Sequence, residues 1–158
     1  MMSRYLIFLL ILLIIYIFVT YFVYPHNTIR INQANIENFQ FQLLYEKHPI
    51  IIQNHNPHHS EIVQKLFSQN FISNNIFNEN TWYKNKHKYL IIYCQENKQV
   101  NICNPDTILS QNIPCEGTNI ISINLQPTQF IILPYKWYVF VDSQNFIGIH
   151  DYFTYLVN

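Results

Sequence analysis

Three histidines lie close together in the first half of the chain, and histidine is a common metal ligand. His55, His58 and His59 form the sequence His-Asn-Pro-His-His, and neutral imidazoles bind zinc and other transition metals. The segment is rich in Asn and brings no obvious fourth ligand. We therefore expect a solvated turn before a helix, with a metal site as the alternative.

A second pair of chemically capable residues, His150 and Asp151, lies near the C-terminus. A His beside an Asp could supply two members of a catalytic triad, in which the carboxylate orients the imidazole. No Ser lies in a nucleophile-elbow context, and the chain has only two glycines, Gly117 and Gly148. We expect instead a strand in which Gly148 and His150 share one face and Asp151 lies on the other.

Three lysines, Lys84, Lys86 and Lys88, alternate along the chain and would face one way on a strand. A cationic strand edge of this kind prevents edge-to-edge aggregation, and contact with anionic lipid or with a protein is the alternative. With so few glycines no phosphate-cradling loop can form, which excludes nucleotide binding by such a motif.

An apolar segment near the N-terminus indicates that these residues are held next to a membrane. Tyr5–Tyr24 contains 20 residues and no charge. At about 1.5 Å per residue, a helix of this length matches the roughly 30 Å hydrocarbon core of a bilayer. A cleaved signal peptide is the alternative, but its apolar stretch is usually shorter and ends at a small-residue site that this sequence lacks. We expect a single-pass membrane protein in contact with the lipid bilayer.

The sidedness of this segment stays open. Arg4 precedes it and Arg30 follows it, which under the positive-inside rule slightly favours a cytoplasmic N-terminus. None of the 20 Asn lies in an Asn-x-Ser/Thr acceptor, which slightly favours a cytosolic domain instead.

Behind this anchor (residues 1–24) we expect a polar linker over 25–35 and one domain over 36–158. From Trp82 onward, short β-branched and aromatic runs alternate with turn residues, as is typical of an antiparallel sandwich or barrel. The fold class is therefore α+β, mostly β, with an N-terminal transmembrane helix and two short helices before the sheets. The expected strands are Tyr89–Cys94, Val100–Cys103, Asn119–Asn124, Phe130–Leu133, Trp137–Val141 and Phe146–Leu156.

The two short helices are expected over Glu37–Lys47 and His58–Gln69, where apolar side chains recur at helical spacing. Asn56-Pro57 suits the start of the second helix. Between the helices, Pro49–Gln53 is a β-branched run typical of a buried strand. Residues 71–80 are expected to be irregular.

The composition restricts the function classes further. Nine basic and nine acidic side chains cancel, so nothing favours nucleic acid as a partner. The 26 Ile and 20 Asn reflect A/T-rich codons, as in a large DNA virus or a protist parasite. Cys94, Cys103 and Cys115 show no recognisable spacing; we expect neither a disulfide framework nor a zinc site, although one pair could close in an oxidising compartment.

Two stretches carry a resemblance to a known family. Phe41–Gln53 has the sequence FQLLYEKHPIIIQ and Leu125–Val139 has the sequence LQPTQFIILPYKWYV. The first resembles the opening of JmjC-like cupins, which include Fe(II)- and 2-oxoglutarate-dependent protein hydroxylases. The second is similar to that family's segment of two prolines and a Trp, with Pro127, Pro134 and Trp137 at the family's spacing. The resemblance implies a cupin-like β-domain.

The same resemblance implies a site for Fe(II), which needs two His and one carboxylate. The family's distal His corresponds to Val139 here, and His87 has no carboxylate two residues further on. We therefore expect a degenerate domain with no metal, no cofactor and no catalytic residues. The weaker candidates for ligands are His87, Asp106 and His150.

Three functions are consistent with these features. The preferred one is a non-catalytic structural or interaction role with a protein partner, in a viral membrane or an organelle. The alternatives are a membrane-tethered Fe(II)/2-oxoglutarate-type oxygenase and a small-ligand-binding β-barrel. In the last case Trp82, Trp137 and Tyr138 would line the pocket.

Overall fold

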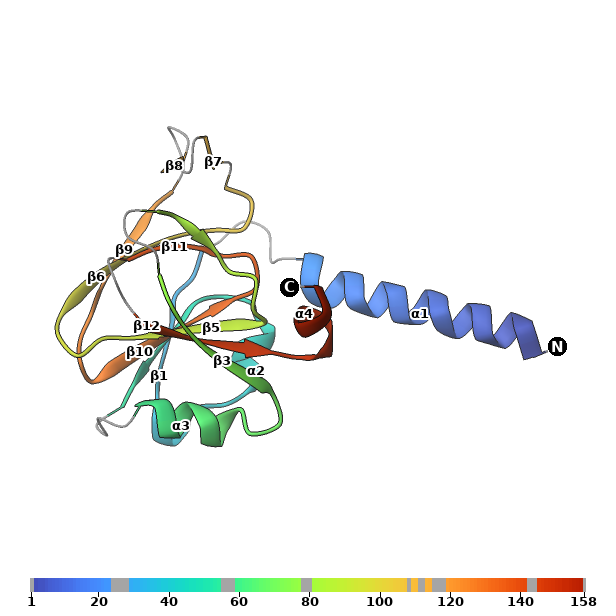
Figure 1. The fold of residues 1–158 in the computed structure, drawn as a ribbon, viewed down its shortest axis with the longest axis horizontal. Coiled ribbons are helices and arrows are strands. Elements are labelled where there is room, and N and C mark those ends of the chain that lie inside the picture. Colours follow the sequence, from blue (N-terminus) through green and yellow to red (C-terminus); the bar gives the residue numbers. More distant parts are fainter. Residues whose placement is uncertain are drawn as a thin grey trace.

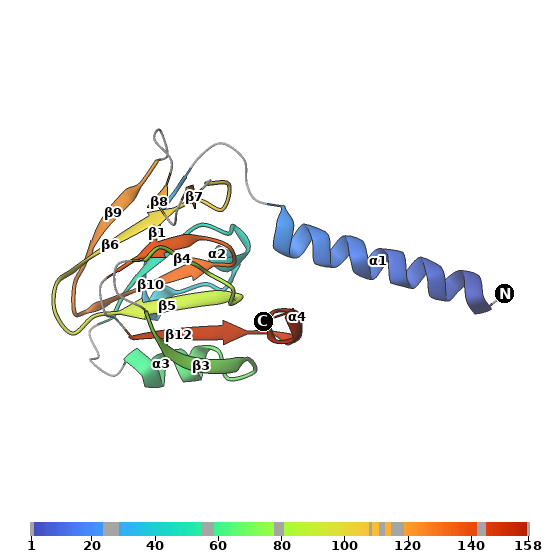
Figure 2. The ribbon, with the colours of Figure 1, turned by 45° about the horizontal axis from the view of Figure 1, so that its top comes forward.

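A single long helix leaves the domain at one side and points away from it (Figures 1 and 2). The computed structural model describes residues 2–23, 29–54, 59–77, 81–107, 109–110, 113–114, 119–141 and 145–157. Helix α1 (Met2–Phe22) contains Tyr5–Phe22, a stretch long and apolar enough to cross a membrane. Only 6% of that stretch is buried, whereas a core helix would be mostly buried. The expected apolar helix is therefore present.

The larger of the two main sheets has six strands in the order β1-β2-β10-β5-β12-β3. All its neighbours are antiparallel except β1 and β2, which are parallel. Its strands are β1 (Asn32–Asn35), β2 (Ile50–Gln53), β3 (Phe71–Ile76), β5 (Tyr89–Tyr93), β10 (Gln129–Pro134) and β12 (Asn145–His150).

The second sheet lies over one face of the first (Figure 2). Its four strands have the order β4-β11-β6-β9, and all three pairs are antiparallel. The expected α+β, mostly β class is confirmed, and the arrangement is consistent with a cupin-like sandwich. The second sheet comprises β4 (Tyr83–Lys84), β6 (Lys98–Cys103), β9 (Ile121–Leu125) and β11 (Tyr138–Phe140), and a separate two-stranded ladder joins β7 (Leu109–Ser110) to β8 (Ile113–Pro114).

The core has two layers because side chains alternate along each strand. On β10, Ile131 and Leu133 pack in the layer between the sheets, while Phe130 and Ile132 pack in the outer layer. Helices α2 (Gln42–Tyr45) and α3 (His59–Leu66) cover that outer layer, to which α2 contributes Leu44 and α3 contributes Val63. The larger sheet is therefore buried on both faces along its centre.

Two expectations about the strands are wrong. Residues 71–76 are not irregular but form β3, which pairs with β12 along its whole length; 78–80 lie outside the described residues. The expected strand Phe146–Leu156 ends at His150, and α4 (Tyr152–Val157) follows it. The cause is Asp151, whose carboxylate accepts the Thr154 N–H at 3.0 Å and caps the helix.

The expected helices are shorter in the structure. Over Glu37–Lys47 a 3-10 turn, η1 (Ile36–Asn38), and the one-turn α2 replace a continuous helix. Helix α3 confirms the second one, while Asn56-Pro57 lies outside the described residues. The end of the expected linker, Asn32–Asn35, is β1 and belongs to the larger sheet.

One buried and one exposed isoleucine of the larger sheet give a direct test of this core. Ile52 on β2 is fully buried, whereas Ile76 on β3 is 69% exposed. We expect Ile52→Ala to lower the free energy of unfolding by about 2–4 kcal/mol, and Ile76→Ala to change it by less than about 0.5 kcal/mol. Urea unfolding of the full chain in detergent, followed by tryptophan fluorescence, measures both; equal effects would contradict the assigned register.

Candidate functional site

Two of the three candidate ligands, His87 and His150, meet at one end of the larger sheet. His87 Nδ1 lies 2.7 Å from His150 Nε2. The Tyr83 hydroxyl lies 3.1 Å from His87 Nε2, and the Ser73 hydroxyl lies 3.3 Å from His150 Nε2. Both residues are at least nine-tenths buried, but the network is not closed. His150 Nδ1 is buried without a hydrogen-bond partner, and His87 lines a pocket of about 290 Å³ together with Tyr83 and Phe146.

Backbone and glycine geometry place His87 against β12. A Cβ atom added to Gly148 would lie 2.5 Å from His87 Nδ1 and 2.7 Å from Ser73 Oγ, so only glycine leaves room for the ring. From the other side, the buried Asn85 amide donates to the carbonyl oxygens of Leu133 and Pro134 at 3.0 and 2.8 Å. Its Oδ1 accepts the backbone N–H of His87 at 2.8 Å. Asn85 therefore fixes the backbone of His87, and Gly148 leaves room for its ring.

Both histidines are held neutral. Burial, with added repulsion from His150 and Lys86, lowers the pKa of His87 from 6.5 to about 4. Burial also lowers the pKa of His150, although Thr154 and Asp151 oppose this. A nitrogen–nitrogen contact of 2.7 Å needs one bare nitrogen to accept the hydrogen bond, so the pair cannot hold two added protons in this geometry.

The residues present do not fit an Fe(II) site. Val139 is fully buried in β11, between Tyr83 of β4 and Ile102 of β6. Asp106 does not join the two histidines: within the described part of the chain, no three His, Cys, Asp or Glu side chains gather. An iron triad needs two imidazoles and a carboxylate around one point, and the histidine pair has no carboxylate.

Other ligand candidates are not brought to this site. His55 and His58 lie outside the described residues, and the structure describes the backbone of His59 alone. Cys94 and Cys103 are buried free thiols, and burial raises the pKa of each. Any pairing that involves Cys115 lies outside the described residues.

The three aromatic residues expected to line a pocket each contact different neighbours. Trp137 packs in the layer between the sheets, and its Nε1 donates to the Lys47 carbonyl at 3.2 Å. Trp82 packs on Phe140, with 5.7 Å between ring centroids. The Lys84 amino group lies over the Tyr138 ring, 4.8 Å from its centroid. Trp137 and Tyr138 are buried, 3% and 8% exposed, and the lining of a ligand pocket by these three aromatics stays a prediction.

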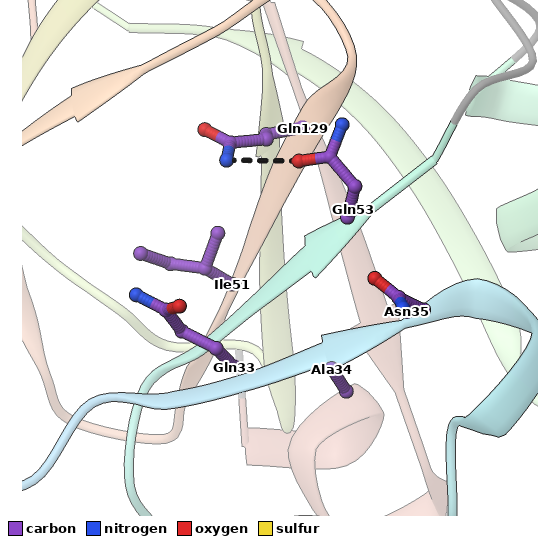
Figure 3. A pocket seen from close by; sticks show the side chains of 6 residues that line it. All are labelled: Gln33, Ala34, Asn35, Ile51, Gln53 and Gln129. Carbon is purple, nitrogen blue, oxygen red and sulfur yellow. Dashed lines mark hydrogen bonds between the residues drawn. The ribbon is translucent and has the colours of Figure 1, made fainter.

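A polar pocket of about 260 Å³ opens beside β1, β2 and β10 (Figure 3). No charged side chain contributes to its lining. Since Ile51 belongs to the layer between the sheets, this pocket continues the inner face of the larger sheet where that face becomes exposed. The lining residues are Gln33, Ala34, Asn35, Ile51, Gln53 and Gln129.

Hydrogen bonds fix two of these amides. Gln129 Oε1 accepts the Gln126 N–H at 3.1 Å, Gln129 Nε2 donates to Gln53 Oε1 at 3.0 Å, and Gln53 Nε2 donates to Thr128 Oγ1 at 2.7 Å. The chain of bonds sets which end of each amide faces which neighbour. Gln33 is exposed beside this chain, so the pocket offers neutral donors and acceptors to a partner.

The end of α1 is docked on the domain through Tyr21 and Asp151. The Tyr21 hydroxyl donates to Asp151 Oδ2, and the Lys88 amino group lies 3.1 Å from the same oxygen. The Tyr21 ring packs 4.3 Å from Phe153 and 5.7 Å from Tyr135, centroid to centroid. Burial alone would raise the pKa of Asp151, but the bonds from Tyr21 and Thr154 and the Lys88 charge lower it overall.

Two lysines complete this helix–domain junction. Lys47 Nζ donates to the carbonyl of Val19, at 2.7 Å, and to that of Val23. Lys136 Nζ lies 3.8 Å from the centroid of the Phe22 ring. Both lysines have positive φ, 57° and 67°, and among the described residues they are the only non-glycine residues that do. A left-handed residue costs about 1–2 kcal/mol, and here each one carries a cation to the end of α1.

Burial alternates along the three lysines: Lys84 and Lys86 are exposed and Lys88 is half-buried, with the buried Asn85 and His87 between them. Lys84 lies on β4, and Lys88 pairs with Asp151. Sequence reasoning missed the docking roles of Lys47 and Asp151. The one local signal was the Asp151-x-x-Thr154 spacing, which is typical of a helix cap.

The comparisons with known proteins leave the family open. No family model matches the sequence, and no curated protein matches it. Among solved structures, the chain is similar to RmlC from Streptococcus suis, determined in complex with dTDP-D-xylose, with a TM-score of 0.33 and 9% identity. The match covers 60% of this chain and 54% of that one, so the chain spans about half of its length. A similarity of this extent says nothing about activity or ligand.

The histidine pair predicts a pH dependence of stability. Because the pKa of His87 is lower in the folded chain, the unfolded chain binds more protons at this residue between pH 6.5 and about 4. The lowered pKa of His150 acts in the same direction. We expect the free energy of unfolding to fall as the pH drops through this window, by at most about 1.4 kcal/mol per pH unit for each histidine. Urea unfolding at pH 7.5, 6 and 5 measures this slope, and the double variant His87→Gln/His150→Gln should flatten it. An unchanged slope would show that other groups cause it.

The junction predicts a coupling between Tyr21 and Asp151. A hydrogen bond to a charged group contributes about 1.5–3 kcal/mol, so Tyr21→Phe and Asp151→Asn should be non-additive by about 1–2 kcal/mol. Thermal or urea unfolding of the two single variants and the double variant in detergent gives this coupling energy. The matched control is Tyr21→Phe with Asp106→Asn, which should be additive. Additivity in both cycles would mean that the Tyr21–Asp151 bond contributes no coupling energy.

Proposed function

We propose that the chain is a single-pass membrane protein whose α1 holds a non-catalytic, degenerate JmjC-like cupin domain at the bilayer surface for contact with a protein partner. The observation that carries this proposal is the junction. Lys47 and Asp151 bind the end of α1 directly, so the anchor sets the orientation of the domain as well as its location. A tether that served only to retain the domain would need no such contacts.

The dimensions of α1 support the anchor. Its 21 residues extend about 31 Å at 1.5 Å per residue, close to the hydrocarbon thickness of a bilayer. Its apolar side chains are exposed all along Tyr5–Val19, with Ile17 half-buried. Side chains that are apolar on every face of a helix require an apolar surrounding, which lipid supplies here.

The inner surface of the domain supports a non-catalytic role. The position that the resemblance assigns to a ligand holds the aliphatic Val139, and its side chain packs in the core. The two histidines that do meet are bonded to each other and to Tyr83 and Ser73. Three of their four ring nitrogens are therefore engaged within the fold, and His150 Nδ1 is buried without a partner. The high Ile and Asn content, which A/T-rich codons encode, fits a viral or parasite membrane as the setting.

The amide-lined pocket is the surface that best fits a protein partner. It lies at the Gln129 end of β10, whereas Pro134 at the other end lines the junction with α1. Five residues of strand separate the two by about 17 Å, so the pocket remains open when the junction faces the membrane. Neutral amides bind main-chain and amide groups of a partner without a charge requirement. We therefore expect an uncharged, polar partner surface.

Two measurements on the full chain in its native membrane test this proposal. The chain should resist extraction at alkaline pH, and a photo-reactive residue at Gln33 should give a reproducible cross-linked protein adduct. The same residue placed at Gln99, an exposed glutamine of β6, is the matched control and should give none. Release of the chain at alkaline pH, equal adducts at both positions, or stoichiometric iron in the purified protein would contradict the proposal.

A further inference from the structure

We infer that the face of the domain around α4 is seated in the boundary of the bilayer, so that lipid covers its exposed apolar side chains. This inference rests on the proposed membrane anchor and goes beyond it, because an anchored domain could equally stand clear of the membrane. The occupant of this face is the lipid surface itself.

The length of α1 does not allow the domain to stand clear. The cavity at the junction, of about 400 Å³, is lined by Tyr16 and Thr20 of α1 and by Tyr45 and Tyr135 of the domain. The domain therefore lies beside the last seven residues of the helix. If those residues were above the hydrocarbon, only Tyr5–Ile15 of the uncharged stretch that follows Arg4 would remain inside it, about 17 Å of a required 30 Å. The domain surface next to Tyr16 must then reach the level where the hydrocarbon begins.

The side chains on that surface are apolar and exposed. In α4, Tyr152 is 77% exposed, Leu156 80% and Val157 61%, and in α2 Tyr45 is 80% exposed. Helix α4 lies next to the end of α1 in both views of the chain (Figures 1 and 2), and Phe153 contacts Tyr21 directly. Two short helices from distant parts of the sequence thus expose large side chains beside the same helix end.

The aromatic content fits the interface rather than the hydrocarbon interior. Phe71 stacks on Tyr155, with 4.7 Å between centroids, and meets Tyr152 edge-on at 5.5 Å. Tyrosine collects at membrane–water boundaries because its ring is apolar and its hydroxyl is polar. Such a cluster at the bilayer boundary buries its rings while its hydroxyls stay hydrated.

The charges near the junction fit lipid headgroups. Lys47, Lys88 and Lys136 surround the end of α1, and Asp151 is the acidic group bonded within the junction. The three cations lie on the face that carries the exposed tyrosines, where headgroup phosphates would be found. If two copies of this chain associated through this face, the three lysines of one copy would lie near those of the other and repel them. Self-association through this face is therefore less favourable than contact with lipid.

Depth-dependent quenching on the full chain in phosphatidylcholine vesicles tests this inference. Leu156→Cys carries an environment-sensitive fluorophore, with Cys115→Ser to remove that thiol; Cys94 and Cys103 are buried. Lipids brominated near the top of the acyl chain should reduce its emission by about twofold or more. Ile76→Cys is the matched control, since Ile76 is 69% exposed but lies at the end of β3 away from α4.

A second labelled site protects the test against local damage to α4. Tyr45→Cys lies on a separate element and should be quenched as strongly as the label at residue 156, while the label at residue 76 should not be quenched. No quenching at both sites in a chain that resists alkaline extraction overturns this inference and leaves the anchor intact. Emission at short wavelength without quenching, together with disulfide cross-linking between two Leu156→Cys chains, overturns it in favour of a second copy. A chain released at alkaline pH overturns both proposals.

Discussion

The open carbonyl groups at the end of α1 impose the constraint on which the arrangement of the whole chain depends. The last carbonyls of a helix have no partner within it, and at a membrane boundary water supplies few. Lys47 donates to two carbonyls there, and its cation also complements the negative end of the helix dipole. Lys47 itself has a left-handed backbone conformation. The hydrogen bonds from its amino group to the end of α1 therefore offset the strain in its backbone.

The inner face of the larger sheet divides into an aliphatic centre and two polar ends. Ile51, Ile131 and Leu133 fill the centre, the histidine pair closes one end, and the amides of Figure 3 lie at the other. Buried polar groups are tolerated where their bonds are made internally, as between His87 and His150. Exposed amides with room beside them can exchange those bonds with a partner. The same sheet thus carries the buried histidine pair at one end and the exposed amide-lined pocket at the other.

The parts of this fold that local sequence determines were predictable, and the parts that depend on distant neighbours were not. The run Ile50–Ile52 forms a strand because β-branched residues suit a buried sheet. Residues 71–76 contain Ser and two Asn, and they form β3 only because β12 lies alongside. The sequence of α4 has the composition of a strand, and a capping aspartate makes it a helix. His87 and His150 are 63 residues apart, so no spacing pattern could pair them.

Strand β1 gives the connection between anchor and domain a mechanical property. It follows α1 in the chain and forms four residue pairs with β2 in parallel. A pull on the membrane segment would first break the Tyr21 and Lys47 contacts and only then load this ladder, along the strand direction and across all its pairs together. The contacts at the junction would break first under load. The β1–β2 ladder, loaded in shear, would keep the domain folded while the membrane moves.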